Sequence, residues 1–320
     1  MLTAHCIPSS YLINPFSTQT ISYAFHDIDG THSLIREWAP VMSVLLADVI
    51  TYGLPDNLES EENCTRLINL AGKKPFPETD RFCEESAGLS ALTQMEWAIR
   101  RAIEERQITI SCDMFVNSQK IQRIWNGEEI SDDLPETPEM QQFLSVNAPR
   151  LFRLYERILN GYCRNHNLAV AAHSPELYRV PGSLAFLEYL KQNGVKNYFV
   201  TGAVVEKGKG MFQEIETLGY TIGNGCLAED IIGSTWDEKL PKNVIMNRLL
   251  QTLGISGDQV LIVGDGRAEI SAGVSMGAVT VSRLPKTSLY QRSLHQKLGT
   301  NLIFPDYTDP ILYKYFQRKE

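Results

Sequence analysis

Two carboxylates, Asp27 and Asp29, lie two positions apart in the run 27–31, Asp-Ile-Asp-Gly-Thr. The preceding residues 21–26 alternate between apolar and small or polar side chains, which predicts a strand. Ligands bind outside the carboxyl ends of strands in an open parallel sheet, and alternate residues of an extended segment share one side. Because two anions this close repel each other, a divalent cation would relieve the strain. The same residues also make ordinary turns.

A second apolar strand, predicted at 260–263, delivers further carboxylates. Asp265 stands between two glycines, and Glu269 follows it. Hard cations take oxygen ligands, and magnesium is usually held by one or two carboxylates together with waters and substrate oxygens. We therefore expect Asp265 to be a second metal anchor, and Glu269 to orient a lysine or a metal-bound water.

Three further residues have the chemistry of phosphate binding. Thr201 and Gly202 follow a predicted strand at 198–200, where a hydroxyl and an accessible backbone N–H can donate to an anion. Lys242 precedes a predicted helix at 243–253, beside an N-terminus that attracts anions. Lys239 competes with Lys242 for this role. Taken singly, each is more typical of a turn or a solvated surface.

The elements that carry these residues alternate along the chain after about residue 180. Predicted strands at 198–200, 231–232, 260–263, 279–281 and 302–304 are separated by helices at 181–190, 205–218 and 243–253. This alternation predicts an α/β fold with a doubly wound parallel sheet, which the strand at 21–26 joins.

The intervening stretch has helical spacing, with helices predicted at 34–50, 90–106 and 140–158. Pro40 is expected to kink the first of these helices and Pro149 to break the last. Pro-rich pieces at 75–80 and 126–138 are expected to be loops. The predicted organisation is an N-terminal extension at 1–19, a core at 20–33 and 180–320, and a helical insertion at 34–179.

In order and spacing, the four motifs at Asp27–Thr31, Thr201, Lys242 and Gly264–Glu269 resemble those of the haloacid dehalogenase (HAD) superfamily. The insertion lies between the first and second motifs, as does the all-helical cap of the phosphoglycolate phosphatase and β-phosphoglucomutase branch. The resemblance implies a Rossmann-like core with an inserted cap domain, although this insertion is longer than the usual cap.

The resemblance also implies a mechanism. Asp27 would attack phosphorus and form an aspartyl-phosphate, while Asp29 would protonate the leaving group and then activate water. Mg²⁺ would be held by Asp27, the main-chain carbonyl of Asp29, and Asp265. The phosphoryl oxygens would be held by Thr201, Gly202 and Lys242.

The expected activity is hydrolysis of a small phosphorylated metabolite, and several alternatives stay open. Asp29 argues against a dehalogenase, since carbon–halogen members of the superfamily generally lack this carboxylate. A phosphomutase of the β-phosphoglucomutase type shares these residues and is the main alternative, ahead of a phosphonoacetaldehyde hydrolase. A non-catalytic regulator that binds a phosphorylated ligand is a rival from another class, disfavoured because every catalytic position holds a competent residue.

Four more residues near these motifs have polar side chains of interest. Lys73 and Lys74, in the insertion, are candidates for contacting the substrate beyond its phosphate, although a solvated basic turn is the more ordinary interpretation. His26 and His32 flank the first motif, and we interpret them as packed core histidines rather than catalytic groups.

Bulk composition limits the partners. The 320-residue chain has a formal net charge of −8, which disfavours broad nucleic-acid binding but not a small anionic substrate. Its six cysteines form no metal-binding spacing and are expected to be reduced thiols. We see neither a leader peptide nor an apolar run of about 18 residues, so we expect a cytoplasmic protein without a membrane partner. The oligomeric state is not predicted.

Overall fold

The structure is a computed structural model that describes residues 11–17, 21–128, 133–235 and 240–317. The chain folds into two compact units, which are described separately. The first comprises Met1–Ile35 and Leu168–Glu320, and the second Arg36–Asn167. Whereas the sequence placed the end of the insertion at 179, the second unit ends inside helix α7 (Asn165–Ala171).

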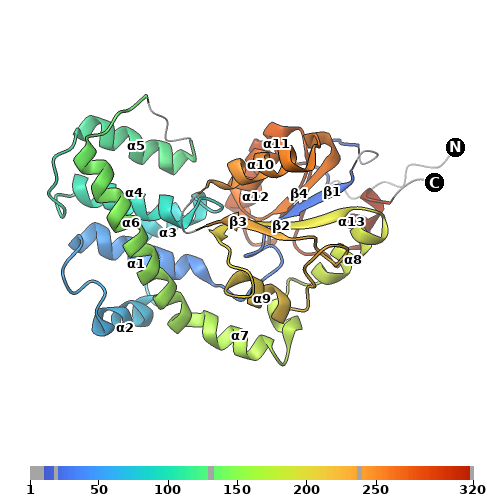
Figure 1. Cartoon of the computed structure of the whole chain (residues 1–320), viewed down its shortest axis with the longest axis horizontal. Coiled ribbons are helices and arrows are strands. Elements are labelled where there is room, and N and C mark those ends of the chain that lie inside the picture. Colours follow the sequence, from blue (N-terminus) through green and yellow to red (C-terminus); the bar gives the residue numbers. More distant parts are fainter. Residues whose placement is uncertain (1–10, 18–20, 129–132, 236–239, 318–320) are drawn as a thin grey trace. The chain divides into compact units, whose positions relative to one another are not determined.

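The first unit contains a six-stranded sheet in the order β3-β2-β1-β4-β5-β6, with every neighbouring pair parallel (Figure 1). Its strands are β1 (Tyr23–His26), β2 (Lys196–Val204), β3 (Ile231–Ser234), β4 (Val260–Gly264), β5 (Val279–Arg283) and β6 (Leu302–Phe304). The chain first builds outward from β1 to β3, then returns to β4 and builds the other way. The order therefore reverses between β1 and β4, where sheets of this kind bind ligands.

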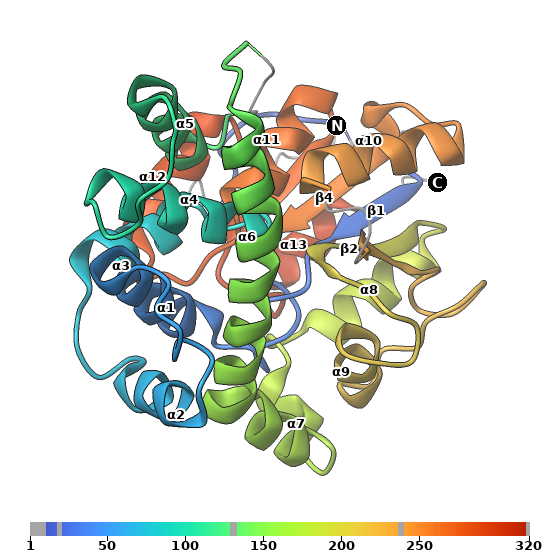
Figure 2. The same ribbon diagram turned by 60° about the vertical axis from the view of Figure 1, so that its left-hand side comes forward.

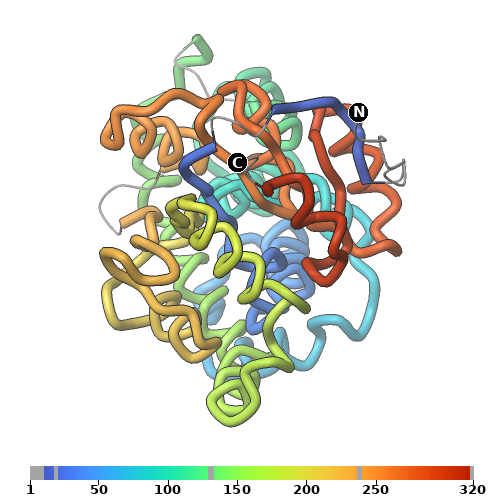
Figure 3. The backbone as a smooth tube through the Cα atoms, turned by 90° about the vertical axis from the view of Figure 1, so that its right-hand side faces the viewer, coloured from blue at the N-terminus to red at the C-terminus, as the bar shows by residue number. Residues whose placement is uncertain are grey.

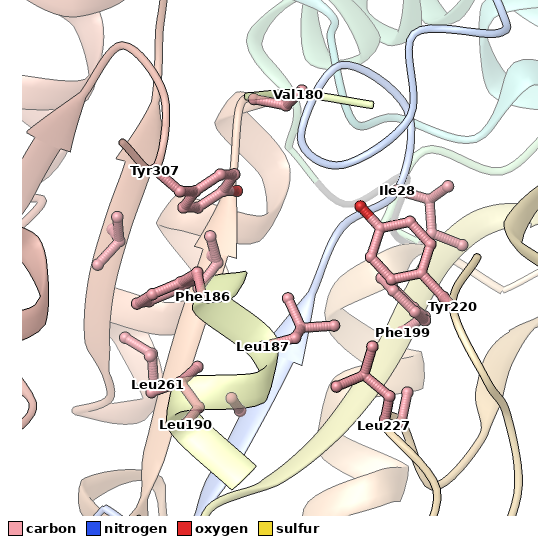
Figure 4. Packing of buried hydrophobic residues seen from close by; sticks show 14 of the residues in the cluster. Ile28, Val180, Phe186, Leu187, Leu190, Phe199, Tyr220, Leu227, Leu261 and Tyr307 are labelled. Carbon is pink, nitrogen blue, oxygen red and sulfur yellow. The ribbon is translucent and has the colours of Figure 1, made fainter. Parts of the chain in front are cut away.

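Helices cover both faces of this sheet. They are α8 (Ser183–Gln192), α9 (Met211–Thr217), α10 (Lys242–Leu253), α11 (Arg267–Met276), α12 (Leu289–Leu298) and α13 (Pro310–Tyr315). Consecutive strand residues enter different cores: Ala24 packs with Phe186 and Leu187 of α8, whereas Phe25 packs with residues of α10. Figure 4 shows part of the first of these cores, with Phe186, Leu187 and Leu190 against strand residues. The predicted doubly wound α/β fold is thus confirmed.

Two elements of the first unit differ from the sequence prediction. Helix α9 begins at Met211 rather than near 205, because Gly208 and Gly210 adopt positive φ values of 76° and 52°, which a right-handed helix does not allow. Strand β2 does not stop before Thr201 but continues to Val204. Its register against β3 shifts between Val200 and Val204, which is typical of a bulge.

Part of the N-terminal extension packs on the far edge of the sheet. Leu12 forms an antiparallel bridge with Leu302 of β6, and the Tyr11 ring stacks on Phe304 with centroids 4.5 Å apart. Figure 3 shows this segment, near the label N, beside the C-terminal part of the chain. These contacts cover the open edge of β6, a role that the sequence did not reveal.

The second unit is entirely helical in the residues that the structure describes. Its elements are α1 (Trp38–Tyr52), α2 (Glu61–Leu70), α3 (Pro77–Glu85), α4 (Ala91–Glu104), α5 (Met114–Asn126), α6 (Pro138–Leu159), a π-helical turn (Asn160–Arg164) and the start of α7. Helix α6 runs the length of the unit (Figure 2) and contacts α1, α2 and α4. Helices α1, α4 and α6 contribute most of the buried apolar residues of this unit.

Three predictions for this unit were wrong in detail. Helix α6 continues through Pro149, because its apolar face stays buried on both sides of the proline. Pro40 lies in the first turn of α1, where a missing N–H costs nothing. Residues 77–80 are helical rather than a loop: Pro77 is the first residue of α3, and Asp80 accepts from the Phe76 N–H at 2.8 Å.

No helix among the described residues is long and apolar enough to cross a membrane. Five cysteines are free thiols, and Cys6 lies outside the described residues.

Candidate active site

The loop after β1 is a tight turn closed by its own backbone. The Asp27 N–H continues the ladder to the Val263 carbonyl of β4 at 2.8 Å. The Ile28 carbonyl then accepts from the N–H groups of Thr31, His32 and Ser33 at 2.9–3.2 Å. Strand pairing and this turn together fix the position of the Asp27 carboxylate at the carboxyl edge of the sheet.

Asp27 is held through both carboxylate oxygens. Oδ1 accepts from Lys242 Nζ at 2.6 Å, and Oδ2 accepts from Thr31 Oγ1 at 3.3 Å. Lys242, the first residue of α10, is itself buried and lies 3.2 Å from Glu269 Oε2. One ammonium group therefore bridges two buried carboxylates.

Asp265 approaches the same loop from β4. Its Oδ1 accepts from Thr31 Oγ1 at 3.2 Å, so Thr31 touches both aspartates. A Cβ at Gly30 would lie 2.0 Å from Asp265 Oδ2, and Gly30 has φ +76°. Only glycine fits at this point of the loop, because a side chain there would displace the Asp265 carboxylate.

Glu269, in the first turn of α11, is fixed by the same segment that carries Asp265. Its Oε1 accepts from the Gly266 N–H at 2.6 Å, and a Cβ at Gly264 would lie 2.3 Å from its Cγ. Its Oε2 is left facing Lys242. Glu269 thus contacts the lysine that it was suggested to orient, and its two suggested roles, orienting Lys242 or a metal-bound water, stay predictions.

The carboxylates Asp27, Asp265 and Glu269, with Lys242, form what we call the carboxylate cluster. Burial and the charge of Glu269 outweigh Lys242 and raise the pKa of Asp27, and burial with the repulsion of Asp27 raises the pKa of Asp265 well above its usual range. Burial would also raise the pKa of Glu269, but Lys242 and the Gly266 N–H hold it low. Although burial opposes its charge, Lys242 keeps a raised pKa because of Asp27 and Glu269.

The residues present fit a divalent cation. Asp27, Asp265 and Glu269 each offer a ligand oxygen, and these oxygens lie within 4.8 Å of one another. All are hard oxygen ligands, as magnesium prefers. Burial first, and then neighbouring carboxylates, raise the pKa of both aspartates, so the site disfavours their charged forms and a bound cation would offset this.

The other predicted site residues have different placements. Thr201 is buried and lies with Gly202 in the irregular stretch of β2. Since Phe199 pairs with His26, Thr201 reaches the same edge of the sheet as Asp27. Asp29 pairs with Ser33 within the loop. Lys239 lies outside the described residues.

Lys73 and Lys74 belong to the helical unit. Both are exposed and line a pocket of about 350 Å³, in which Lys74 Nζ lies 4.8 Å from the centroid of the Phe76 ring.

Two contacts of the loop were missed from the sequence. Arg283 Nη1 donates to the Gly30 carbonyl at 2.7 Å, and the Tyr307 hydroxyl donates to the Thr31 carbonyl at 3.0 Å. Arg283 had a signal, because it lies two residues after the predicted apolar strand at 279–281, much as Asp27 and Asp265 follow the predicted strands at 21–26 and 260–263. Tyr307 had none, because it lies in a loop after β6.

A family profile described as "haloacid dehalogenase-like hydrolase" matches residues 58–277, more than half of the chain. The chain belongs to this family. The matched range includes Lys242, Asp265 and Glu269, whereas Asp27 and Asp29 precede it. The superfamily inferred from the sequence motifs is thereby confirmed.

Solved structures with this fold include a protein named provisionally as a phosphoglycolate phosphatase from Lactobacillus delbrueckii subsp. bulgaricus, with TM-score 0.51, 13% identity and coverage of 94% of this chain and 100% of that one. A predicted phosphoglycolate phosphatase from Haemophilus somnus has TM-score 0.46 and 17% identity, with coverage of 92% of this chain and 98% of that one. A provisionally named beta-phosphoglucomutase from Bacteroides vulgatus has TM-score 0.49 and 13% identity, with coverage of 93% of this chain and 88% of that one. Of these three, the Lactobacillus structure has a TM-score above 0.5, and at 13% identity its likeness concerns the fold alone. No curated protein matches the chain.

Proposed function

We propose that this hydrolase is a magnesium-dependent phosphatase that cleaves a small phosphate monoester through an aspartyl-phosphate on Asp27. The observation that carries the proposal is the carboxylate cluster: Asp27 lies 2.6 Å from Lys242, and its ligand oxygens lie within 4.8 Å of those of Asp265 and Glu269. Residues suited to be a nucleophile, a phosphate-binding cation and metal ligands thus lie together, following β1 and β4 and in the first turns of α10 and α11.

Asp27 acts as the nucleophile. One of its oxygens attacks phosphorus, the bond from phosphorus to the leaving oxygen breaks, and that oxygen takes a proton from Asp29. Asp29 then removes a proton from water, whose oxygen attacks phosphorus and releases Asp27. The support for this role is the place of Asp29 in the same turn, two residues after Asp27 and bridged to Ser33.

The phosphoryl oxygens are bound by Lys242, the Thr201 hydroxyl and the Gly202 N–H. Glu269 holds the ammonium group of Lys242 toward Asp27, and Thr31 keeps the Asp27 carboxylate beside Asp265. Most of the rate enhancement comes from this positioning and from electrostatics, as in other phosphoryl transfers.

Asp27, Asp265 and the main-chain carbonyl of Asp29 would hold the Mg²⁺ ion. When bound, it supplies positive charge that offsets the repulsion between the nucleophile and the phosphate. The pKa values of Asp27 and Asp265, raised by burial and by neighbouring carboxylates, support this assignment.

Substrate groups beyond the phosphate are proposed to contact Lys73 and Lys74. The support is the pocket of about 350 Å³ that these lysines line with Phe76 and Asp80, which offers two cations beside an aromatic surface. We expect kcat/KM for the true substrate to fall in Lys73→Ala and Lys74→Ala. Unchanged values in both variants would remove this part of the proposal.

The test of the function is turnover of para-nitrophenyl phosphate and a panel of small phosphate esters, with Mg²⁺ and with EDTA. Phosphate release that requires Mg²⁺ is expected. Isomerisation of a sugar phosphate without phosphate release would instead indicate a phosphomutase. No turnover by folded protein would favour a regulator that binds a phosphorylated ligand.

A further inference from the structure

Two buried histidines flank the loop that carries Asp27. His26 is the last residue of β1, His32 follows Thr31, and both are 0% exposed. His26 Nδ1 lies 3.0 Å from His32 Nε2. This contact joins the residues on either side of the 27–31 loop, next to the bond from Thr31 to Asp27.

The direction of this hydrogen bond follows from Asn197. Asn197 Nδ2 donates to the carbonyls of Leu187 and Leu227, both at 3.0 Å, which turns its Oδ1 toward His26. Because Oδ1 only accepts, His26 Nε2 must carry a proton and donate to it at 3.1 Å. A neutral His26 then has a bare Nδ1, so His32 Nε2 carries the proton between the two rings.

The same reasoning extends to the other side of His32. With its proton on Nε2, His32 Nδ1 accepts from Ser183 Oγ at 3.2 Å, and Ser183 in turn accepts from the Tyr220 hydroxyl. The chain of donors therefore runs in one direction: Tyr220, Ser183, His32, His26 and Asn197. We call these five residues the histidine relay, although no proton transfer is implied.

The relay is locked from both sides by aromatic rings. His32 stacks on Tyr307 with centroids 5.0 Å apart and an interplanar angle of 6°, and the Tyr307 hydroxyl holds the Thr31 carbonyl. Figure 4 shows the hydroxyl ends of Tyr220 and Tyr307 pointing toward each other across the core. Tyr220 also lies 3.4 Å from the His32 carbonyl. Side chain and backbone of His32 are thus both fixed.

Both imidazoles are suited to stay neutral. Both rings are fully buried, and the other groups within hydrogen-bonding distance of their ring nitrogens, Asn197, Ser183 and Tyr307, are uncharged, so the site favours the neutral form. An added proton would place two N–H groups face to face between the rings. Hydrogen bonds that all run in one direction, from Tyr220 to Asn197, therefore require both imidazoles to be neutral.

We propose that His26 and His32 are positioning residues, which close the base of the 27–31 loop and hold Asp27 and Thr31 in their working geometry. The expected change in kcat rests on the proposed function, whereas the expected tautomers and the rigidity of the loop do not. An apolar pair would fill the same space without needing partners. A polar network instead favours one orientation of the loop, because His32 Nε2 faces His26 Nδ1 at 3.0 Å, with the Tyr307 hydroxyl farther away at 3.4 Å.

The first test needs no substrate. We expect ¹⁵N NMR of histidine-labelled wild-type protein at pH 7 to show both His26 and His32 as neutral Nε2–H tautomers. A cationic ring or an Nδ1–H tautomer at either position would overturn the inference, whether or not the protein is a phosphatase.

The second test compares His32→Leu with His32→Gln, whose amide can still donate to His26. Amide hydrogen exchange in a peptide covering 27–33 is expected to rise about tenfold or more in His32→Leu and much less in His32→Gln. The matched control is His295→Leu, which removes another buried imidazole of this unit, one bonded to Ser282. Unchanged loop exchange in His32→Leu, or an equal rise in His295→Leu, would contradict the proposal.

Kinetics then separate positioning from stability. In His32→Leu, kcat per folded molecule should fall about tenfold or more with KM nearly unchanged, and His32→Gln should recover most of it. A lowered melting temperature with unchanged kcat would show a purely structural role and overturn the inference. Absence of activity in the wild type would contradict the proposed function alone, since tautomers and loop exchange would still test the relay.

Discussion

A cluster of buried charged side chains occurs in each of the two units, and these two clusters differ in the balance of positive and negative groups. In the helical unit, Arg100 lies 2.6 Å from both Glu96 and Glu136, and Lys120 lies 3.2 Å from Glu136. Two cations there face two anions. In the carboxylate cluster, Lys242 is the cation within hydrogen-bonding distance of Asp27 and Glu269, with Asp265 beside them.

The pKa shifts express this difference. Burial alone would lower the pKa of Arg100 and raise that of Glu136, but their partners outweigh it, so Arg100 is raised and Glu136 lowered. Both groups are stabilised in their charged forms. The aspartates of the carboxylate cluster have raised pKa values instead. A balanced cluster is complete as a structural element, whereas an under-compensated one is suited to a cation and an anionic substrate.

Asp27→Asn should show the largest contrast. Turnover is expected to fall roughly 10⁴-fold or more, because the amide is not a competent nucleophile. Stability should be kept or increased, since the change removes a charge from a repulsive cluster. Kinetics and denaturant unfolding measure the two effects, with the exposed Asp258→Asn as control. A strong loss of stability would contradict the account of the cluster as under-compensated.

Glu136→Gln should show the opposite pattern in the balanced cluster. Removing one partner leaves Arg100 and Lys120 short of an anion, which is expected to cost about 3 kcal/mol of unfolding free energy. Glu61→Gln, which removes an exposed partner of Arg157, should cost less than about 1 kcal/mol. Equal effects in the two variants would mean that burial does not distinguish these ion pairs.

The loss of unfolding free energy in Glu136→Gln should decrease as the pH is lowered. Since the folded protein lowers the pKa of Glu136, its charge stabilises the fold above the unfolded value near 4.5, and this stabilisation is lost as pH falls through the lowered folded value. The difference between wild type and Glu136→Gln is therefore expected to be full at pH 7 and to shrink below about 4.5. A constant difference in denaturant titrations would argue against an ionic origin.

Mg²⁺ bound at the carboxylate cluster should stabilise the fold by offsetting the negative charge of the aspartates. At a concentration 100-fold above its Kd, it is expected to stabilise the wild type by about 2.7 kcal/mol. Asp265→Asn should lose most of this gain, yet be at least as stable as the wild type in EDTA, because a carboxylate with a raised pKa is costly to ionise. Thermal unfolding with and without Mg²⁺ measures both. Full Mg²⁺ stabilisation in Asp265→Asn would exclude Asp265 as a ligand.

Gly30→Ala against Gly254→Ala gives the smallest expected effect. Both glycines have positive φ, 76° and 65°, so each alanine should cost about 1–2 kcal/mol of backbone strain. Only at Gly30 does the new methyl meet Asp265, at 2.0 Å, whereas a Cβ at Gly254 meets nothing within 4 Å. Mg²⁺ affinity, measured by calorimetry, should therefore weaken in Gly30→Ala alone. Equal affinities in the two variants would contradict the geometry of the loop.

The predictability of the two clusters from sequence also differed. Asp27, Lys242 and Asp265 could be selected because their chemistry is tied to local signals, namely an apolar strand that ends in carboxylates or a helix that begins at a lysine. The alternation of strands and helices likewise predicted the sheet. Such signals lie within a few residues, and they survive errors in element boundaries such as the late start of α9.

The balanced cluster and the histidine relay carried no such signal. Arg100 of α4 contacts Glu136 in the loop before α6, and His26 contacts Asn197 at a separation of 171 residues. Neither pairing has a spacing that periodicity can detect. His26 and His32 were correctly expected to be buried, but the bond between them depends on how β1, β2 and α8 pack.

The most direct test of the central claim is to trap the intermediate on Asp27. The protein would be mixed with Mg²⁺ and a hydrolysable phosphate ester, quenched in acid and treated with borohydride, which reduces an acyl phosphate to an alcohol. We predict that peptide mass spectrometry will find homoserine at position 27, and that it will be absent when Mg²⁺ is replaced by EDTA. Rapid phosphate release with position 27 unmodified, or reduction at another carboxylate, would contradict the account.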